Sequence, residues 1–380
     1  METGISEAFI EHFAELKDPR INRKKLYPLE EILFIMLCGT LCGAESWRDF
    51  VLFGREKKEF LRRYFPYANG IPSKNTFARV FCALDSVVFK SCFIKWVKSL
   101  QISINGVVAI GGKTLCNSGD EDKDIRAIHV VSAFATETRL VLGQQKVDEK
   151  SNEITAIPLL LDLLDLKGTT VTLDAIGCQK EIAKKIREKE ADYVLALKGN
   201  QGTLNEGVRL FLETEFSKKE ISDLIDDRYE ETEAGHGRIE ERKCIVSSQI
   251  DWLKQKSEWA DIKTVVMIEE TRDTGKKCSV DRRFYISSLS GDAKRITAAV
   301  REHWLVENAL HWTLDVVFNE DGSCIRKEYA AQNMAIVRPI ALNRLGQAKK
   351  HFNKDIGIKA LRKKAGWGND TLELTLKQNF

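Results

Sequence analysis

The hydrophobic pattern of the chain changes its period near residue 105. In 28–44, 47–65 and 87–100, apolar residues recur three and four positions apart, as in helices with one buried face. After residue 105 the apolar runs are short and rich in β-branched residues, which favours strands. The pattern therefore predicts an all-helical region over residues 1–100, followed by a region that mixes strands and helices.

The mixed region has a definite order of predicted elements. Three strands come first, and the polar Thr136-Glu137-Thr138 between the second and the third predicts a hairpin. A helix, a strand, a second helix and a further strand follow, and this order predicts a mixed sheet with helices on its faces. The predicted bounds are 107–110, 126–136 and 138–147 for the first strands, then 152–166, 169–174, 179–191 and 192–199.

Residues 200–290 interrupt this order with further strand-like runs. They lie at 236–248, 262–273 and 281–290, and we expect them to form a separate small sheet inserted into the domain. Residues 293–318 then predict one long helix.

Composition and charge narrow the functional classes. With 43% hydrophobic and 30% charged residues, the chain resembles an ordinary soluble protein, and its longest apolar stretch, 32–44, is too short to span a bilayer. No signal-peptide pattern opens the chain, and nine scattered cysteines without a Cys-x-x-Cys pair favour a reducing, cytoplasmic location over disulfides or structural zinc. Both ends are basic and the middle is acidic, which fits either a polyanionic partner or a solvated surface.

Two carboxylates are candidates for chemistry. Asp174 ends a predicted buried strand, where it could bind a metal ion or a substrate, or simply cap the next helix. Glu307 lies between His303 and His311 at spacings of four, so the three side chains would share one helix face. A zinc site is disfavoured because the His-Glu-x-x-His motif is absent, and a packed polar face is the alternative.

Basic residues suggest contacts with DNA phosphates. Ser73 is a plausible N-cap, and Lys74, Asn75 and Arg79 would lie near the start of the helix that follows, although an ordinary capped helix reads the same way. Three turns, at 198–201, 236–238 and 319–327, also carry polar or basic residues, and each is a weak signal alone.

The order of elements and a series of long stretches together resemble the DDE transposases of bacterial insertion sequences. Matching stretches include "GAESWRDF", "NGIPSKNTFARVF", "DAIGCQKEIAKKI", "YVLALKGNQ" and "REHWLVENALHWTLDVVFNED", and the resemblance covers nearly the whole chain. It is strongest to the branch that includes the H-repeat-associated proteins found near Rhs elements. The resemblance implies a ribonuclease-H-like catalytic domain over 101–345, with an insertion at about 200–290. A helical, DNA-binding domain over 1–100 and a basic tail over 346–380 would flank it.

The resemblance also implies an active site of three acids that hold two Mg²⁺ or Mn²⁺ ions. Asp174 matches the second acid of the family and Glu307 the third. The first belongs to an Ile-Asp-Gly-Lys-Thr-Leu-Arg motif, and this chain instead has "IGGKTLC", with Gly111 at the position of the acid and Cys116 at that of the arginine. Because the first acid bridges both ions in this fold, its absence predicts weakened metal binding.

Three functions follow as hypotheses. The first is an insertion-sequence transposase that cleaves and joins double-stranded DNA at element ends as a homodimer, in a copy inactivated or impaired by Gly111. The second is a DNA-binding protein derived from a transposase that does not cleave. The third is a nuclease in which Asp120 or Asp122 replaces the missing acid. The residues expected to contact DNA are Lys74, Asn75, Arg79, Lys113, Lys198, Asn200, His236, Arg238, His303 and Arg326.

Overall fold

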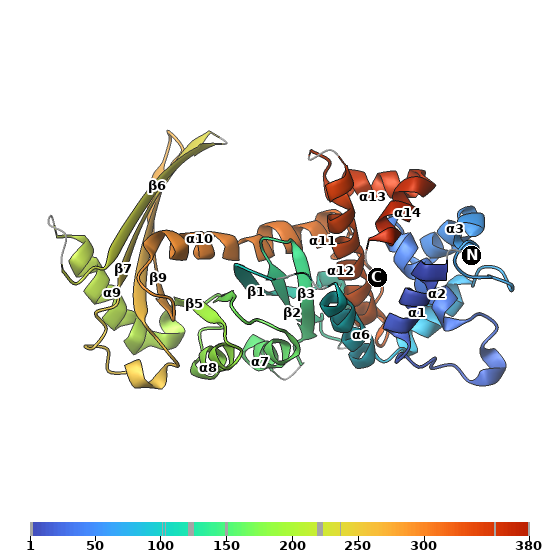
Figure 1. Cartoon of the computed structure of the whole chain (residues 1–380), viewed down its shortest axis with the longest axis horizontal. Coiled ribbons are helices and arrows are strands. Elements are labelled where there is room, and N and C mark those ends of the chain that lie inside the picture. Colours follow the sequence, from blue (N-terminus) through green and yellow to red (C-terminus); the bar gives the residue numbers. More distant parts are fainter. Residues whose placement is uncertain are drawn as a thin grey trace.

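The structure is a computed structural model of the whole chain, shown in Figure 1. It describes residues 3–100, 102, 104–120, 125–148, 151–218, 223–235, 237–352 and 355–378. Asp122 and His236 lie outside the described residues. Among the described residues, no helix combines the length and the apolar character needed to cross a bilayer.

The described residues before 105 form helices and no strand, as the helical spacing predicts. Helix α5 begins after Ser73, whose Oγ accepts a hydrogen bond from the backbone N–H of Thr76, so the predicted N-cap is confirmed. The helices are α1 (Thr3–Phe13), α2 (Leu29–Leu41), α3 (Trp47–Glu56), α4 (Lys58–Leu61), α5 (Lys74–Ala83) and α6 (Ser86–Ser99).

Helices from the two ends of the chain pack together at one end of the molecule (Figure 1). Helix α12 (Ala330–Ala348) lies against α2, α5 and α6, and its buried residues join theirs in one hydrophobic core. The region expected to be a basic tail is folded over its described residues, and it forms α13 (Ile358–Trp367) and α14 (Asn369–Lys377). The buried Arg362 secures α13, because its guanidinium donates hydrogen bonds to the carbonyls of Thr40 and Val317.

One mixed sheet of nine strands forms the rest of the molecule, in the order β3-β2-β1-β4-β5-β9-β8-β7-β6. Strand β1 is antiparallel to β2 and parallel to β4, β4 is parallel to β5, and the other pairs are antiparallel. The first five strands are β1 (Val107–Thr114), β2 (His129–Ala135), β3 (Leu140–Lys146), β4 (Thr170–Leu173) and β5 (Asp192–Leu197), and α7 (Glu153–Leu163) and α8 (Lys180–Glu188) alternate with them as predicted.

The expected separate sheet does not form. Strand β9 pairs with β5, with Val194 opposite Ser287, so the inserted strands extend the main sheet. Strand β9 thereby covers the edge of β5, whose backbone N–H and C=O groups would otherwise form an exposed sheet edge. The inserted elements are α9 (Gly202–Phe216), β6 (Asp227–Gly235), β7 (Arg238–Ser247), β8 (Thr264–Asp273) and β9 (Cys278–Ser287), and we call β6–β9 the arm.

The expected long helix is interrupted. Helix α10 (Ala293–His303) is followed by a π-helical turn (Val306–His311) and by α11 (Trp312–Val316). Helix α10 crosses one face of the sheet over β1, β4 and β5, while α7 and α8 lie on the other side (Figure 1). A π-helical turn widens the helix by one residue and is often found at functional sites.

Candidate active site

The pairing of β1 with β4 brings Gly111 and Asp174 next to each other. The last parallel pair in the register is Ile110 with Leu173, and Gly111 and Asp174 are the next residues of their strands. Strand β1 is longer than predicted, because it continues to Thr114 by pairing with β2 alone. Position 111 therefore lies where β4 has ended and one side of β1 is no longer paired.

Gly111 faces the π-helical turn. A Cβ atom built at Gly111 would lie 3.6 Å from Oε1 of Glu307 and 2.8 Å from Cγ1 of Val306. Gly111 has no positive φ angle, so its backbone does not require glycine. A side chain at this position would point at Glu307, and Val306 would have to shift to admit it.

Asp174 is exposed at the end of β4 and stabilises a turn. Its Oδ1 accepts hydrogen bonds from the backbone N–H groups of Ile176 (3.1 Å) and Gly177 (3.3 Å). The N-cap of α8 is Gln179, so Asp174 does not cap that helix. The turn fixes the direction of the carboxylate and leaves Oδ2 outside these two hydrogen bonds.

Two histidines orient Glu307 and the helix around it. His311, which is 5% exposed, places Nδ1 3.2 Å from Oε2 of Glu307, and this contact is the main reason that the pKa of Glu307 is lowered. His303 Nδ1 lies 3.1 Å from the hydroxyl of Thr172 on β4. Burial lowers the pKa of His303, against the opposing charges of Asp174 and Glu307. Both carboxylates therefore act on one imidazole, which supports a shared site.

Lys113 is buried among carboxylates and does not face outward. Its Nζ lies 2.7 Å from Asp315, 2.8 Å from Asp321 and 3.6 Å from Glu320. Burial alone would lower the pKa of Lys113, but the three carboxylates outweigh burial and raise it. In this structure the lysine ties the end of β1 to the segment after α11, and it is not available to a DNA phosphate.

Cys116 lies on the same cluster. Its backbone N–H donates to Oδ1 of Asp321 at 3.3 Å, and its Sγ is 3.6 Å from Oδ2 of the same carboxylate. A basic side chain at position 116 would thus meet Asp321. The Cys116 thiol therefore occupies a place where a second cation would help to balance the three carboxylates around Lys113.

The remaining residues expected to contact DNA are spread over several surfaces. Lys74, Asn75 and Arg79 are exposed on α5, and Lys198 is exposed after β5. The other three are engaged by neighbours: Asn200 donates to the carbonyl of Ala175 (2.6 Å), Arg238 pairs with Glu240, and Arg326 donates to the carbonyl of Asn117.

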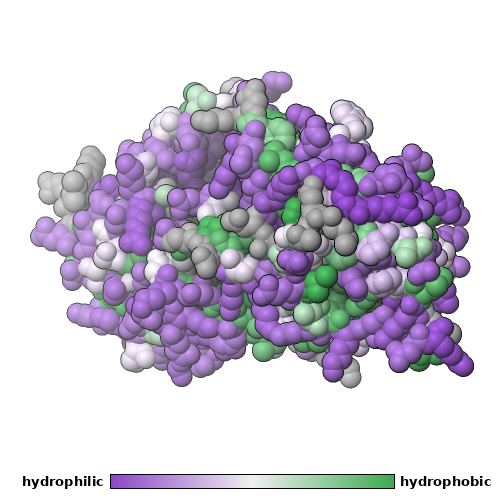
Figure 2. Space-filling view, turned by 45° about the vertical axis from the view of Figure 1, so that its right-hand side comes forward, coloured by the Kyte–Doolittle hydropathy of each residue, from purple (hydrophilic) through white to green (hydrophobic). Residues whose placement is uncertain are grey.

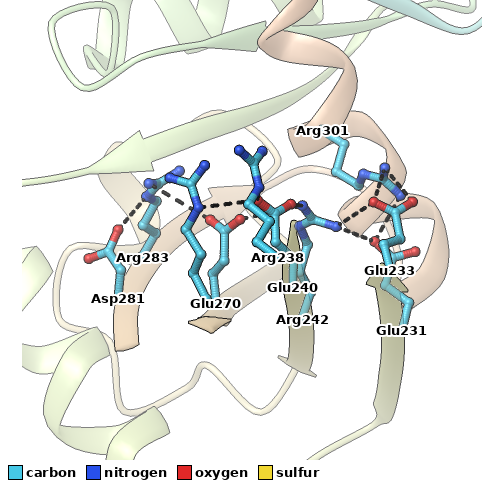
Figure 3. Close-up of polar contacts among 10 residues, drawn as sticks. Glu231, Glu233, Arg238, Glu240, Arg242, Glu270, Asp281, Arg283 and Arg301 are labelled. Carbon is cyan, nitrogen blue, oxygen red and sulfur yellow. Dashed lines mark hydrogen bonds and ion pairs between the residues drawn. The ribbon is translucent and has the colours of Figure 1, made fainter. Parts of the chain in front are cut away.

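The arm meets α10 through a dense network of ion pairs (Figure 3). Arg301 of α10 binds Glu231 and Glu233 of β6, and Arg242 of β7 pairs with both of them. The network borders a cavity of about 390 Å³ that Trp304 also lines. Its arginines are neutralised by carboxylates, and it fastens the arm to the helix that leads to Glu307. The further members are Arg238, Glu240, Glu270, Arg272, Asp281 and Arg283.

Gly112, the second glycine of β1, also lies against side chains, which the sequence pattern does not predict. Gly112 faces the other side of the sheet, where a Cβ would lie 2.2 Å from Oε1 of Glu153 and 2.7 Å from Nε2 of His129. Glu153 and His129 form an ion pair of 2.8 Å. They are 24 residues apart, so only the paired strands and α7 reveal that they meet.

The first acid of the family, which is missing at Gly111, has no replacement in the described part of the chain. Within residues that the structure describes, no group of three His, Cys, Asp or Glu side chains could hold a metal ion. Asp120 lies beyond β1 in a bridge with Ile125. The site therefore offers two carboxylates, Asp174 and Glu307, beside Gly111.

Comparison with known families agrees with this arrangement. Residues 77–344 match the family described as "Transposase DDE domain", and residues 10–97 match the one described as "DDE_Tnp_1-associated". The chain belongs to the DDE transposase family. Its DDE match includes Gly111, Asp174 and Glu307, so the candidate site lies inside the domain that defines the family.

Relatives of this DDE transposase match it over nearly its full length. It is 41% identical to "Putative transposase YncI" of Escherichia coli O157:H7, over 97% of this chain and 94% of that protein. It is 42% identical to "H repeat-associated putative transposase YhhI" of Escherichia coli (strain K12), over 90% of each. Among solved structures, it is similar to a piggyBac transposase in a synaptic complex with hairpin DNA, at 13% identity and a TM-score of 0.45, over 98% of this chain and 77% of that one.

Proposed function

We propose that this protein is an insertion-sequence transposase whose ability to cleave DNA is lost or strongly impaired by Gly111. Two observations carry the proposal: the strand register places Gly111 beside Asp174, and a Cβ at Gly111 would lie 3.6 Å from Oε1 of Glu307. The order of the first five strands, with α10 across one face, supports a ribonuclease-H-like catalytic domain. Double-stranded DNA at the element ends is the proposed substrate.

Asp174 and Glu307 fit the carboxylate ligands that Mg²⁺ or Mn²⁺ takes, and they would hold such ions. Two bound ions would activate the attacking oxygen and stabilise the leaving oxygen of a DNA phosphate. The turn at Asp174 and the contact with His311 hold the two carboxylates in place without a metal. What the site lacks is the side chain between them, which in this fold would touch both ions.

Position 111 could hold that side chain if Val306 shifts. A Cβ there points toward Oε1 of Glu307, and the ordinary φ angle accepts an aspartate. The obstacle is Val306, whose Cγ1 would be 2.8 Å away. Because Cys116 contacts Asp321, an arginine at 116 would supply the cation that the Lys113 cluster lacks.

The test is metal-dependent cleavage of a labelled duplex that carries the terminal inverted repeat of the element. The natural protein is compared with Gly111→Asp, with Gly111→Asp/Cys116→Arg, and with Gly111→Asp/Val306→Ala in case the valine blocks the new carboxylate. We expect cleavage in Mg²⁺ or Mn²⁺ to rise by several orders of magnitude, since a direct metal ligand is restored and even groups that only hydrogen-bond to metal ligands are worth about 10–100-fold. Cleavage by the natural protein at the rate of the variants would refute the impairment by Gly111.

The second function is DNA binding without cleavage. It is favoured if all the variants bind the duplex and none cleaves it, because the lesion would then extend beyond Gly111 and Cys116. The exposed Lys74, Asn75 and Arg79 on α5 support DNA binding under either function.

A further inference from the structure

Helix α13 presents a stripe of unusual composition. Lys359, Lys363 and Trp367 are spaced four residues apart, so they share one face of the helix. All three are exposed, and Trp367 is the most exposed large hydrophobic residue of the described chain, at 81%. The opposite face is buried through Leu361, Arg362 and Ala365.

The stripe works against the stability of its own helix. Two lysines four residues apart repel each other, and Lys359 in the first turn meets the positive end of the helix dipole. Across the described residues, no carboxylate forms an ion pair with Lys359 or Lys363, in contrast to the arginines of the arm. Such a local conflict is expected where a surface serves binding.

The stripe is also held rigidly. Arg362 on the buried face donates hydrogen bonds to the carbonyls of Thr40 at the end of α2 and of Val317 just after α11. Gly366 allows close packing, since a Cβ there would come within 2.9 Å of the carbonyl oxygen of Cys42. Helix α13 is therefore fixed to the segment that continues from Glu307, and a rigid surface loses little entropy on binding.

We propose that Lys359, Lys363 and Trp367 form a second DNA-contact surface, which binds the backbone of duplex DNA away from the cleavage site. The two ammonium groups neutralise phosphates, and the indole ring packs against the neighbouring sugars. Charge complementarity favours a polyanion, and the exposed ring adds apolar contact area next to the charges. The proposal rests on the proposed function only in taking DNA as the partner, and it requires no cleavage.

The experiment measures binding of the natural protein to a labelled random-sequence duplex over a range of salt concentrations. We expect Lys359→Ala/Lys363→Ala to reduce the slope of log affinity against log salt by about 2, since each phosphate contact contributes about 1. Trp367→Ala should weaken binding without changing the slope, because the indole carries no charge. Lys359→Arg/Lys363→Arg should keep the natural slope.

The matched control removes Lys184 of α8 and Lys254, two exposed lysines that, like Lys359 and Lys363, form no ion pair among the described residues. This control should leave the slope unchanged. An unchanged slope in Lys359→Ala/Lys363→Ala overturns the proposal. The proposal is also overturned if this variant loses binding to anionic lipid vesicles while its DNA binding stays the same. Cleavage by the Gly111→Asp variants together with an unaltered slope would reject the α13 surface alone. Absence of DNA binding by every variant would reject the surface and the transposase function together.

Discussion

Strand β1 and the segment α10–α11 meet at the candidate active site, and they differ in the side chains that they present to it. The helical segment carries Glu307 with its partner His311, and a hydrogen bond between His303 and Thr172 joins it to β4. Strand β1 keeps its length and its register but presents Gly111 to the site. The difference indicates that the framework of the site does not depend on the missing carboxylate. Packing and hydrogen bonds hold it.

The same contrast holds for surface charge. Figure 2 shows a surface that is largely hydrophilic on the face it displays. The arginines of the network in Figure 3 pair with carboxylates of the protein, whereas Lys359 and Lys363 of α13 have no ion-pair partner among the described residues. Paired charges of this kind join elements, and unpaired ones are available to a ligand.

The largest effect should come from removing Glu307 in a restored site. In Gly111→Asp/Cys116→Arg, we expect Glu307→Gln to lower Mn²⁺-dependent cleavage by at least about a thousandfold, since one metal ligand of three is lost and ligands of one site act as a unit. In the natural protein the same substitution should change little, because the site is already incomplete. Cleavage rates of all four proteins on the same duplex provide the measurement. A restored variant that tolerates Glu307→Gln would show that the third ligand lies elsewhere.

Stability should respond most to the buried lysine of β1. Lys113→Met leaves Asp315, Glu320 and Asp321 without their shared cation, and removing one partner of a buried ion pair costs about 3–5 kcal/mol. Chemical denaturation monitored by circular dichroism measures the loss. Lys167→Met, which breaks an exposed pair with Glu190, is the control and should leave the free energy of unfolding almost unchanged. Equal losses in the two variants would contradict the anchoring role of Lys113.

The two neighbouring glycines of β1 should differ in their tolerance of alanine. At Gly112 the new methyl group would meet the carboxylate of Glu153 at 2.2 Å and break its pair with His129. At Gly111 it would approach Cγ1 of Val306 at 2.8 Å, which is a less severe overlap than the one at Gly112. We expect Gly112→Ala to lower the unfolding free energy by about 1–3 kcal/mol and Gly111→Ala by less. Thermal unfolding of both variants tests the order, and the reverse order would place the tighter face on the side of Val306.

Much of the fold could be predicted because the hydrophobic period separates helices from strands. The order from β1 to β5 and the cap at Ser73 both followed from local pattern. The continuity of the arm with the main sheet did not, since it depends on the pairing of β5 with β9, whose residues lie about ninety positions apart. The π-helical turn was also missed, because the apolar residues of 293–318 keep a helical period across it.

The candidate site could be predicted only in part. Asp174, Glu307 and the vacancy at Gly111 were found through the resemblance of long stretches, and the strand register explains why they meet. Lys113 is among the residues expected to contact DNA, but it is buried. Its burial depends on three carboxylates that lie about two hundred residues away, and no local pattern reports such a contact.

The smallest expected effect is a change in the pH dependence of stability that comes from His303 of α10. Burial holds the pKa of His303 below its usual value of 6.5, so the unfolded chain binds this proton more readily than the folded one. The contribution of His303 to stability is therefore present above pH 6.5 and is lost as the pH falls below it. His303→Gln removes the titrating group and retains a polar contact for Thr172. The midpoint of thermal unfolding should fall on acidification by about 1 to 2 °C more in the natural protein than in this variant. The remaining ionisable groups are the same in both proteins, so their contributions cancel in the difference. An equal fall in the two proteins would mean that the pKa of His303 is the same in the folded and unfolded chains, and that Asp174 and Glu307 offset the effect of burial.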